Sequence, residues 1–323
     1  MMSAPTPLLV AAAAVFAMIS GANDGGSLIA VSVRLPSIRP LAAAGLLALA
    51  IVVVPLTLGM EVATTLATGL VDLGEQPGTS LLAAIVVAVA IVTVLTRVGL
   101  PTSLTLALIG AIAGVGLGLS LPVDWRRLLA VLAIAALAPV VGALAGFVVL
   151  RSLGRLPPGG PANRRIRWMH RGAFTLQCIA YAANDGQKML ALLALAVGGS
   201  VGAVRLGWPH LVALAALFSL GLALGVRRVA ATVSGGIMLA RPTHVVAAEL
   251  SSAGAVLGSS MLGAPVSMTQ SILGGLVGSG VSEGYGRIRW QIAGRVGMAW
   301  VLTLPTALLL AMALSTSLRE VWP

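Results

Sequence analysis

The sequence predicts an all-α integral membrane protein, a polytopic helical bundle with about 10–12 helical membrane segments. The 323-residue chain is 58% hydrophobic and 9% charged, with a mean hydropathy of +1.04, which is too apolar for a soluble domain of this size. Residues 41–60, 81–96, 128–150, 209–226 and 299–314 contain no Asp, Glu, Lys or Arg, and a helix needs about 20 apolar residues to cross a bilayer core. Two short motifs also occur twice in the same order, which indicates a duplicated chain.

Basic residues mark the junction between the two copies. Six arginines lie between residues 151 and 171, around a stretch rich in proline and glycine. Basic loops of membrane proteins face the cytoplasm, so we expect a multi-pass protein of the cell (inner or plasma) membrane with this segment inside. The predicted organisation is a first transmembrane repeat over residues 1–150, a basic cytoplasmic linker over 151–171 and a second repeat over 172–323. The net charge of +11 therefore reflects membrane orientation, and we expect no nucleic-acid partner.

The repeated motifs carry the polar chemistry of the chain. The sequence Ala-Asn-Asp-Gly occurs at residues 22–25 and again, 161 positions later, at 183–186. The pattern P-x-S-x-T occurs at residues 101–105 and again, 164 positions later, at 265–269. Duplicated halves with interrupted helices at matching places are typical of secondary transporters, so we expect broken helices at these motifs.

Placing the two Asn-Asp pairs in apolar membrane helices is energetically unfavourable. A carboxylate at the centre of a membrane helix costs about 2.5–3.5 kcal/mol on insertion scales. Asn23, Asp24, Asn184 and Asp185 are therefore candidates for a transport site. The alternative is that these residues cap helix ends at a break beside the following glycine.

The P-x-S-x-T elements suit an anion. Proline favours the first turn of a helix, and the free N–H groups at a helix start bind phosphate-like ions. The substrate-binding candidates are the hydroxyl residues Thr102, Ser103, Thr105, Ser267 and Thr269, together with Asp24 and Asp185. The alternative is that the elements are ordinary helix caps.

An anion next to carboxylates needs a proton or a cation between them, and either one indicates cation-coupled symport. Hydrogen phosphate can donate a hydrogen bond to a carboxylate and sulfate at neutral pH cannot, a difference that can change selectivity by about 10⁴–10⁵.

Glu249 is a further candidate for coupling, with a structural role as the alternative. Lys188, the only lysine, could pair with Asp185, anchor the helix at the interface or contact substrate.

These motifs resemble the PiT family of inorganic phosphate transporters, especially its short bacterial members. The resemblance rests on residues 21–24, 101–105, 184–188, 248–249, 263–269 and 293–305. It implies two inverted repeats with broken helices and re-entrant hairpins, a midplane phosphate site, homodimers and cation-driven uptake. It further implies that each motif Asp and the hairpin Ser and Thr residues hold phosphate. The cation site or its coupling would involve Asn23, Asn184, Asp24, Asp185, Glu249 and Gln187, with sodium at Asn23 and Asn184.

The sequence also departs from the family pattern. Ser27 stands where the first motif commonly has a second Asn, and Leu106 and Gln270 stand where the hairpins commonly end in His. The coupling ion, proton or sodium, therefore stays open, and no other cofactor is expected.

The leading hypothesis is a phosphate symporter that works by alternating access, and not an enzyme. A sulfate or other oxyanion permease is the alternative. A more remote one is an intramembrane aspartyl protease, which the A-N-D-G context of both Asp residues does not favour.

Overall fold

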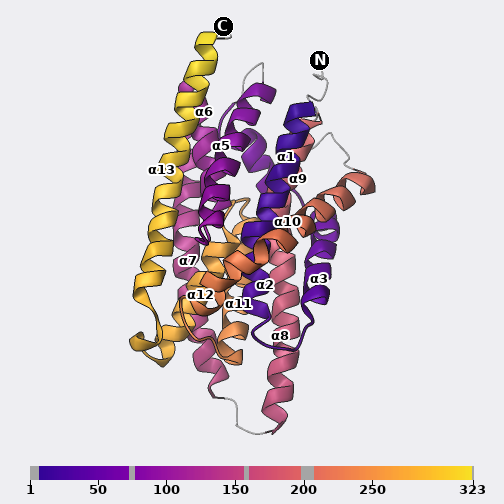
Figure 1. Ribbon diagram of the computed structural model, residues 1–323, viewed down its shortest axis with the longest axis vertical. Coiled ribbons are helices and arrows are strands. Elements are labelled where there is room, and N and C mark those ends of the chain that lie inside the picture. The colour runs from indigo at the N-terminus through magenta and orange to yellow at the C-terminus, as the bar shows by residue number, and fades with distance from the viewer. Residues whose placement is uncertain (1–6, 73–76, 156–159, 198–206, 322–323) are drawn as a thin grey trace.

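The computed structural model describes residues 7–72, 77–155, 160–197 and 207–321 (Figure 1). Within these ranges the fold is all-helical, and the only strand-like pairing is an isolated bridge between Val71 and Val123. The predicted fold class is confirmed.

Each half of the chain contributes a set of helices. The first half consists of α1 (Pro7–Ser20), α2 (Gly26–Ser32), α3 (Pro40–Val53), α4 (Glu61–Thr64), α5 (Pro77–Arg97), α6 (Leu104–Gly118) and α7 (Trp125–Leu153). The second half consists of α8 (Gly160–Tyr181), α9 (Gln187–Ala196), α10 (Trp208–Gly235), α11 (Pro242–Met261), α12 (Met268–Glu283) and α13 (Trp290–Val321). Short π turns, η1 (Gly21–Gly25), η3 (Thr65–Gly69) and η4 (Ala182–Gly186), and short 3₁₀ turns, η2 (Val54–Leu56) and η5 (Tyr285–Arg287), join or extend them.

Five helical stretches are long and apolar enough to cross a membrane. They are Pro7–Ser32, Gly78–Arg97, Trp125–Leu153, Trp208–Val226 and Trp290–Leu318. A sixth candidate is the pair Pro40–Leu56 and Glu61–Gly69, which is bent by 77°. The predicted 10–12 helical segments are reached only when shorter helices such as α6, α9 and α12 are counted as well.

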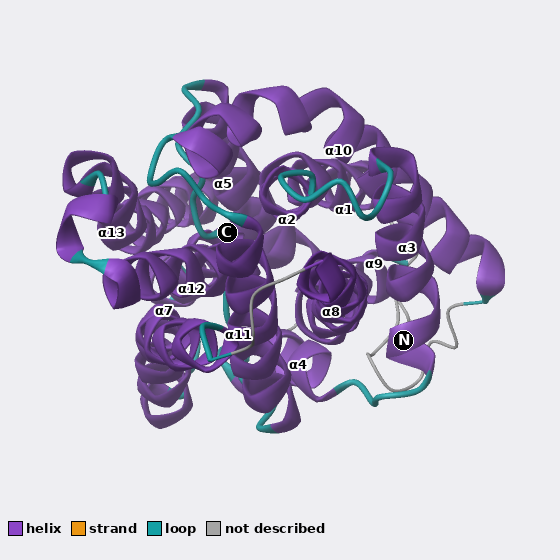
Figure 2. Cartoon of the chain, turned by 90° about the horizontal axis from the view of Figure 1, so that it is seen from below, coloured by secondary structure: helices purple, strands orange, loops and turns teal. Residues whose placement is uncertain are grey.

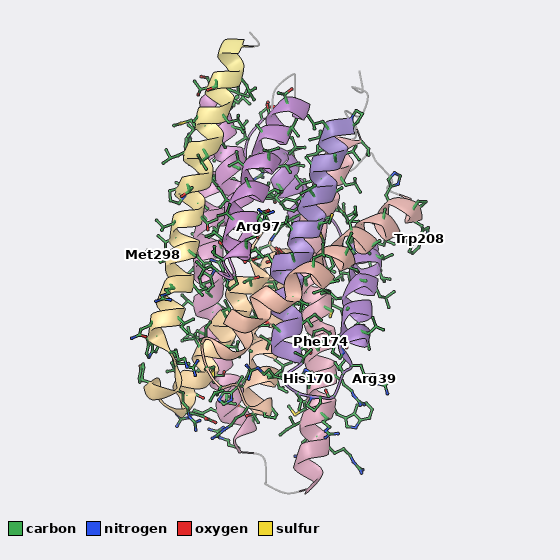
Figure 3. All side chains as sticks on the ribbon, viewed as in Figure 1. Arg39, Arg97, His170, Phe174, Trp208 and Met298 are labelled. Atoms are coloured by element: carbon green, nitrogen blue, oxygen red, sulfur yellow. The ribbon has the colours of Figure 1, made fainter. Side chains whose placement is uncertain are left out.

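The helices run mainly along the long axis of the molecule, and α10 crosses them obliquely (Figure 1). End-on, α7 and α13 lie on one side of the bundle and α3 and α10 on the other (Figure 2). Helix α1 begins at the end where α13 finishes, and α7 ends and α8 begins toward the opposite end (Figure 1). Arg39 lies toward this second end (Figure 3). The described parts of the basic segment, residues 151–155 and 160–171, lie there too and belong mostly to the end of α7 and the start of α8 (Figure 1).

The two halves interlock through matching helices. Helix α7 of the first half packs along α12 of the second, and α13 of the second half packs along α6 of the first. Glycines allow both close approaches: a Cβ on Gly114 would lie 2.2 Å from the Leu308 carbonyl oxygen, and one on Gly278 would lie 1.8 Å from that of Ala143. Small residues let membrane helices pack backbone to backbone. Gly278 follows Gly114 by 164 positions, so the repeat extends to its packing contacts.

The Asn-Asp motifs do not break their helices, contrary to the prediction. Backbone dihedrals stay right-handed helical on both sides of each motif, and the motifs themselves form the π turns η1 and η4. A π turn widens a helix by one residue without ending it, and such turns are frequent at functional sites. The helix-cap alternative for these motifs is wrong as well, because no side-chain cap forms at either turn.

Candidate functional site

Asn23 holds the first hairpin, which consists of α5, α6 and the loop between them, in place. Its Nδ2 donates to the Thr102 carbonyl oxygen at 2.8 Å, and its Oδ1 accepts the Thr102 N–H at 3.2 Å. The Thr96 hydroxyl donates to the same Oδ1 at 3.4 Å. Asn23 Nδ2 also donates to Asp24 Oδ1 at 2.7 Å. The amide therefore fixes the loop between α5 and α6 and supports the neighbouring carboxylate.

Asn184 holds the second hairpin, which consists of α11, α12 and the loop between them, in a similar way. Its Oδ1 accepts the Val266 N–H at 3.1 Å, while its Nδ2 donates to the Ala264 carbonyl at 3.1 Å and to the Ser260 hydroxyl at 3.0 Å. The loop between α11 and α12 is thus tied to the π turn η4.

The two Asn clamps, meaning the hydrogen bonds of each Asn amide to its hairpin, share an equivalent hydroxyl and an equivalent N–H, although their carbonyl partners, Thr102 and Ala264, are not equivalent. Ser260 follows Thr96 by 164 positions, and Val266 follows Thr102 by the same number. Each Asn therefore binds the hairpin of its own half through a residue near the end of the preceding helix and a backbone group before the P-x-S-x-T helix start. Sequence analysis did not find Thr96 and Ser260, although the repeat offset was the signal that could have identified them.

Asp24 reaches across to the other half. The Thr269 hydroxyl, in the first turn of α12, donates to Asp24 Oδ1 at 2.7 Å. Asp24 and Thr269 are 2% and 0% exposed, so water does not compete for this bond. The first Asn-Asp motif and the second P-x-S-x-T element therefore form one cluster.

Asp185 and Thr105 are joined through a lysine. Lys188 Nζ donates to Asp185 Oδ1 at 2.8 Å and to Thr105 Oγ1 at 2.6 Å. Thr105 Oγ1 in turn donates to the Val266 carbonyl at 2.9 Å, which brings the start of α6 against the loop that leads into α12. The expected convergence of the two helix starts is therefore present. Of the roles considered for Lys188, the buried pair with Asp185 is the one found, and an interfacial anchor is wrong because the side chain is only 3% exposed.

Ser103 and Ser267 cap the two converging helices. Ser103 Oγ accepts the Leu106 N–H at 3.1 Å, and Ser267 Oγ accepts the Gln270 N–H at 3.4 Å. Both serines are buried. Because a hydroxyl keeps its own O–H when it accepts a bond, a cap can still donate to an anion at the helix start.

The buried cluster contains polar atoms that lack partners. Asp185 Oδ2 and the Tyr181 hydroxyl make no well-formed hydrogen bond with any residue that the structure describes. Buried polar groups are nearly always paired, so the cluster has room in its hydrogen bonding for a further ligand.

Two candidate residues lie outside this network. Gln187 Oε1 accepts the N–H groups of Val62 and Ala63 at 2.9 and 3.2 Å, and its Nε2 donates to the Gly59 carbonyl at 2.9 Å. Its amide therefore caps α4 rather than facing the carboxylates. The position of Gln187, two residues after Asp185 in the sequence, gave no sign of this role.

Glu249 is engaged with a histidine instead. Its Oε1 lies 3.1 Å from His170 Nε2, and both side chains are fully buried. The Ser32 hydroxyl is also 3.0 Å from His170 Nε2. This pair links α11 to α8, and sequence analysis did not single out His170.

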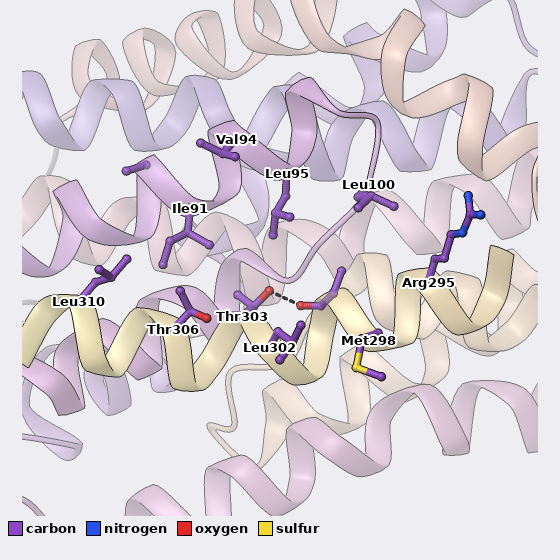
Figure 4. Close-up of a pocket in the computed structure, with 12 residues that line it drawn as sticks. Ile91, Val94, Leu95, Leu100, Arg295, Met298, Leu302, Thr303, Thr306 and Leu310 are labelled. Atoms are coloured by element: carbon purple, nitrogen blue, oxygen red, sulfur yellow. Dashed lines mark hydrogen bonds between the residues drawn. The ribbon is translucent and has the colours of Figure 1, made fainter. Parts of the chain in front are cut away.

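A large pocket between helices lies outside this cluster. It has a volume of about 650 Å³ and lies between α5 and α13 (Figure 4). Its lining is mainly aliphatic, and Arg295 stands at one end as its only charged side chain. Apart from Arg295 this lining offers an oxyanion only the hydroxyls of Thr303 and Thr306, whereas the repeated polar motifs meet in the buried cluster, so the buried cluster remains the candidate site. The two are adjacent, because Thr303 in the pocket wall shares a 2.7 Å hydrogen bond with Thr102.

Comparison with known proteins gives a consistent family. A "Probable low-affinity inorganic phosphate transporter" of Mycobacterium bovis is 31% identical over 312 residues, covering 93% of this chain and 74% of the relative. A protein of the same description from Bacillus subtilis is 28% identical, with 93% of each chain covered. A solved structure described as "The sodium-dependent phosphate transporter" superposes with a TM-score of 0.83 at 19% identity, covering 97% of this chain and 98% of that one, so the fold is shared. Residues 20–170 and 158–311 match the model of the phosphate transporter family, and this chain belongs to that family.

Proposed function

We propose that this protein carries inorganic phosphate across the cell membrane by cation-coupled symport, with the anion bound between the two halves. As a member of a transporter family, the protein is a transporter and not an enzyme. The observation that carries the proposal is the pairing across the halves, in which Asp24 binds Thr269 and Asp185 is linked to Thr105 through Lys188. Elements from both halves thus form a single buried cluster.

The anion would bind at the converging starts of α6 and α12. Free N–H groups and hydroxyls at a helix start bind phosphate without a cationic side chain. Ser103 and Ser267 cap these helices, and Thr105 and Thr269 lie in their first turns. A proton of hydrogen phosphate would give Asp185 Oδ2 a well-formed hydrogen bond, which a fully deprotonated sulfate cannot do.

The cation would enter with the anion. A phosphate beside the Asp24 and Asp185 carboxylates is unfavourable in a low dielectric unless positive charge accompanies it. Oxygen atoms of Asn23, Asp24 and Ser27 lie in one π turn and the turn that follows it, and carboxylate, carbonyl and hydroxyl oxygens suit a small hard cation. This coupling is the physical reason for symport.

Alternating access would proceed by movement of the interlocked halves around the cluster. The residues of the proposed site are buried, with Asp24 and Asp185 only 2% and 4% exposed, which corresponds to a closed state. Residues 151–171 would face the cytoplasm by the positive-inside rule. The protein would form homodimers, as the resemblance to its family implies.

Transport in liposomes tests the proposal. Purified protein should take up labelled phosphate when a sodium or proton gradient is imposed, and excess sulfate should compete weakly. Equal competition by sulfate would make the protein a broader oxyanion permease. Uptake that is independent of every imposed gradient would exclude symport.

A further inference from the structure

The two Asn-Asp motifs differ at one equivalent position. Three residues after Asp24 the chain has Ser27, and three residues after Asp185 it has Lys188. Ser27 and Lys188 are 161 positions apart, as are the two Asn residues and the two Asp residues. A neutral hydroxyl in one half therefore corresponds to a fixed positive charge in the other.

The ammonium group of Lys188 has its full set of partners. It donates to Asp185 Oδ1 at 2.8 Å, to Thr105 Oγ1 at 2.6 Å and, in a short contact, to the Val266 carbonyl oxygen. An ammonium has three N–H donors, and the side chain is 3% exposed. No donor is left for a bound anion in this arrangement.

The three partners form the kind of ligand set that a metal cation would use. They are one carboxylate, one hydroxyl and one backbone carbonyl oxygen, the ligands preferred by hard cations. They come from η4, from the start of α6 and from the loop before α12, so they include both halves. Lys188 fills the space among these oxygens with a charge that is attached to the chain.

The equivalent place in the first half holds no such charge. The Ser27 hydroxyl donates to the Asn23 carbonyl at 2.8 Å. Asp24 receives hydrogen bonds from Thr269 and Asn23, which are neutral. No cationic side chain is hydrogen-bonded to the Asp24 carboxylate, whereas Lys188 binds Asp185 directly and acts on Asp24 only through space.

We propose that the Lys188 ammonium is a tethered cation that permanently occupies the cation position of the second half. Only the first-half position, at Asn23, Asp24 and Ser27, then binds and releases a cation in each transport cycle. This inference rests on the proposed function, and it specifies how many cations accompany the anion. A variant without Lys188 would need one more cation from solution than the native protein.

The test is the cation dependence of phosphate binding by Lys188→Ser, which gives the second half the residue of the first. The phosphate Kd of the purified full-length protein is measured against sodium concentration, with choline chloride holding the ionic strength constant, and again against pH. Binding linked to one additional cation makes the affinity fall about tenfold more for each tenfold dilution of that cation. We expect Lys188→Ser to show this steeper dependence on sodium or on protons. Lys188→Arg, which retains the charge, should keep the native slope.

Two results would overturn the inference. The first is a Lys188→Ser protein that binds phosphate with the native slope against both cations. The second is a Lys188→Ser protein that is folded by thermal melting but binds no phosphate at any sodium concentration, which would make Lys188 a direct phosphate ligand. If the native protein itself binds no phosphate, the proposed function fails instead, so the two failures are distinguishable.

Discussion

Replacing Asn184 with alanine removes the clamp on the second hairpin. The change leaves the Val266 N–H and the Ala264 carbonyl without their partner, and both residues are at least 98% buried. Each unsatisfied buried group costs about 1–3 kcal/mol. The expected total is about 2–6 kcal/mol, and it acts on the loop that positions the start of α12.

The consequence should appear in both stability and binding. If about 2 kcal/mol of this cost destabilises the loop conformation that binds phosphate, the phosphate Kd rises roughly thirtyfold. Isothermal titration of the purified protein with phosphate measures this change, and a thermal melt of the same sample measures the loss of stability.

The matched control is Ser260→Ala. It removes one partner of the same amide at 3.0 Å and leaves both backbone bonds of Asn184 intact. A single neutral hydrogen bond contributes about 0.5–1.5 kcal/mol, so the effect on Kd should stay near or below about tenfold. If Asn184→Ala melts and binds like Ser260→Ala, the clamp does not position the hairpin.

Three further substitutions test separate parts of the account. Gly278→Ala should lower the melting temperature, because the new Cβ would lie 1.8 Å from a carbonyl oxygen of α7 and overpacking costs about 1–3 kcal/mol. The control Gly254→Ala, whose Cβ would have nothing within 4 Å, should leave the melting temperature unchanged. Thr269→Val should raise the phosphate Kd about ten- to hundredfold, because Asp24 loses a hydrogen-bond donor at 2.7 Å and a hydrogen bond to a charged group contributes about 1.5–3 kcal/mol. An unchanged Kd would show that the contact between Thr269 and Asp24 plays no part in phosphate binding. Gln187→Leu should lower the melting temperature but not the affinity, and a large change in affinity would show that its amide does more than cap α4.

Most of the features of the candidate site that could be predicted came from the internal repeat of the sequence. The motif offsets indicated that the two Asn-Asp pairs and the two P-x-S-x-T elements belong together, and the contact of Thr269 with Asp24 joins them across the halves. The apolar stretches similarly predicted a membrane bundle, and the family resemblance is confirmed by the comparison with known proteins. These features depend on local composition and on internal symmetry, which are visible in one sequence.

The backbone geometry of the Asn-Asp motifs and the contacts between residues far apart in the chain could not be predicted from the sequence. Asn, Asp and Gly suit a helix end as well as a π turn, and only the packing of α1 and α8 against their neighbours decides between the two. The cap that Gln187 provides for α4 joins residues 124 and 125 positions apart, and neither end of that contact has a distinguishing pattern. The three-way contact of Lys188 likewise depends on how α6 and the loop before α12 meet.

The most direct test of the central claim is phosphate uptake by Asp24→Asn and Asp185→Asn in liposomes, with Asp72→Asn, an exposed carboxylate, as the control. If the carboxylates of both halves serve one binding site, each buried substitution abolishes gradient-driven uptake although the protein remains folded and inserted. Asp72→Asn should retain the uptake of the native protein. Native uptake by either buried variant would contradict a transport site shared between the two halves.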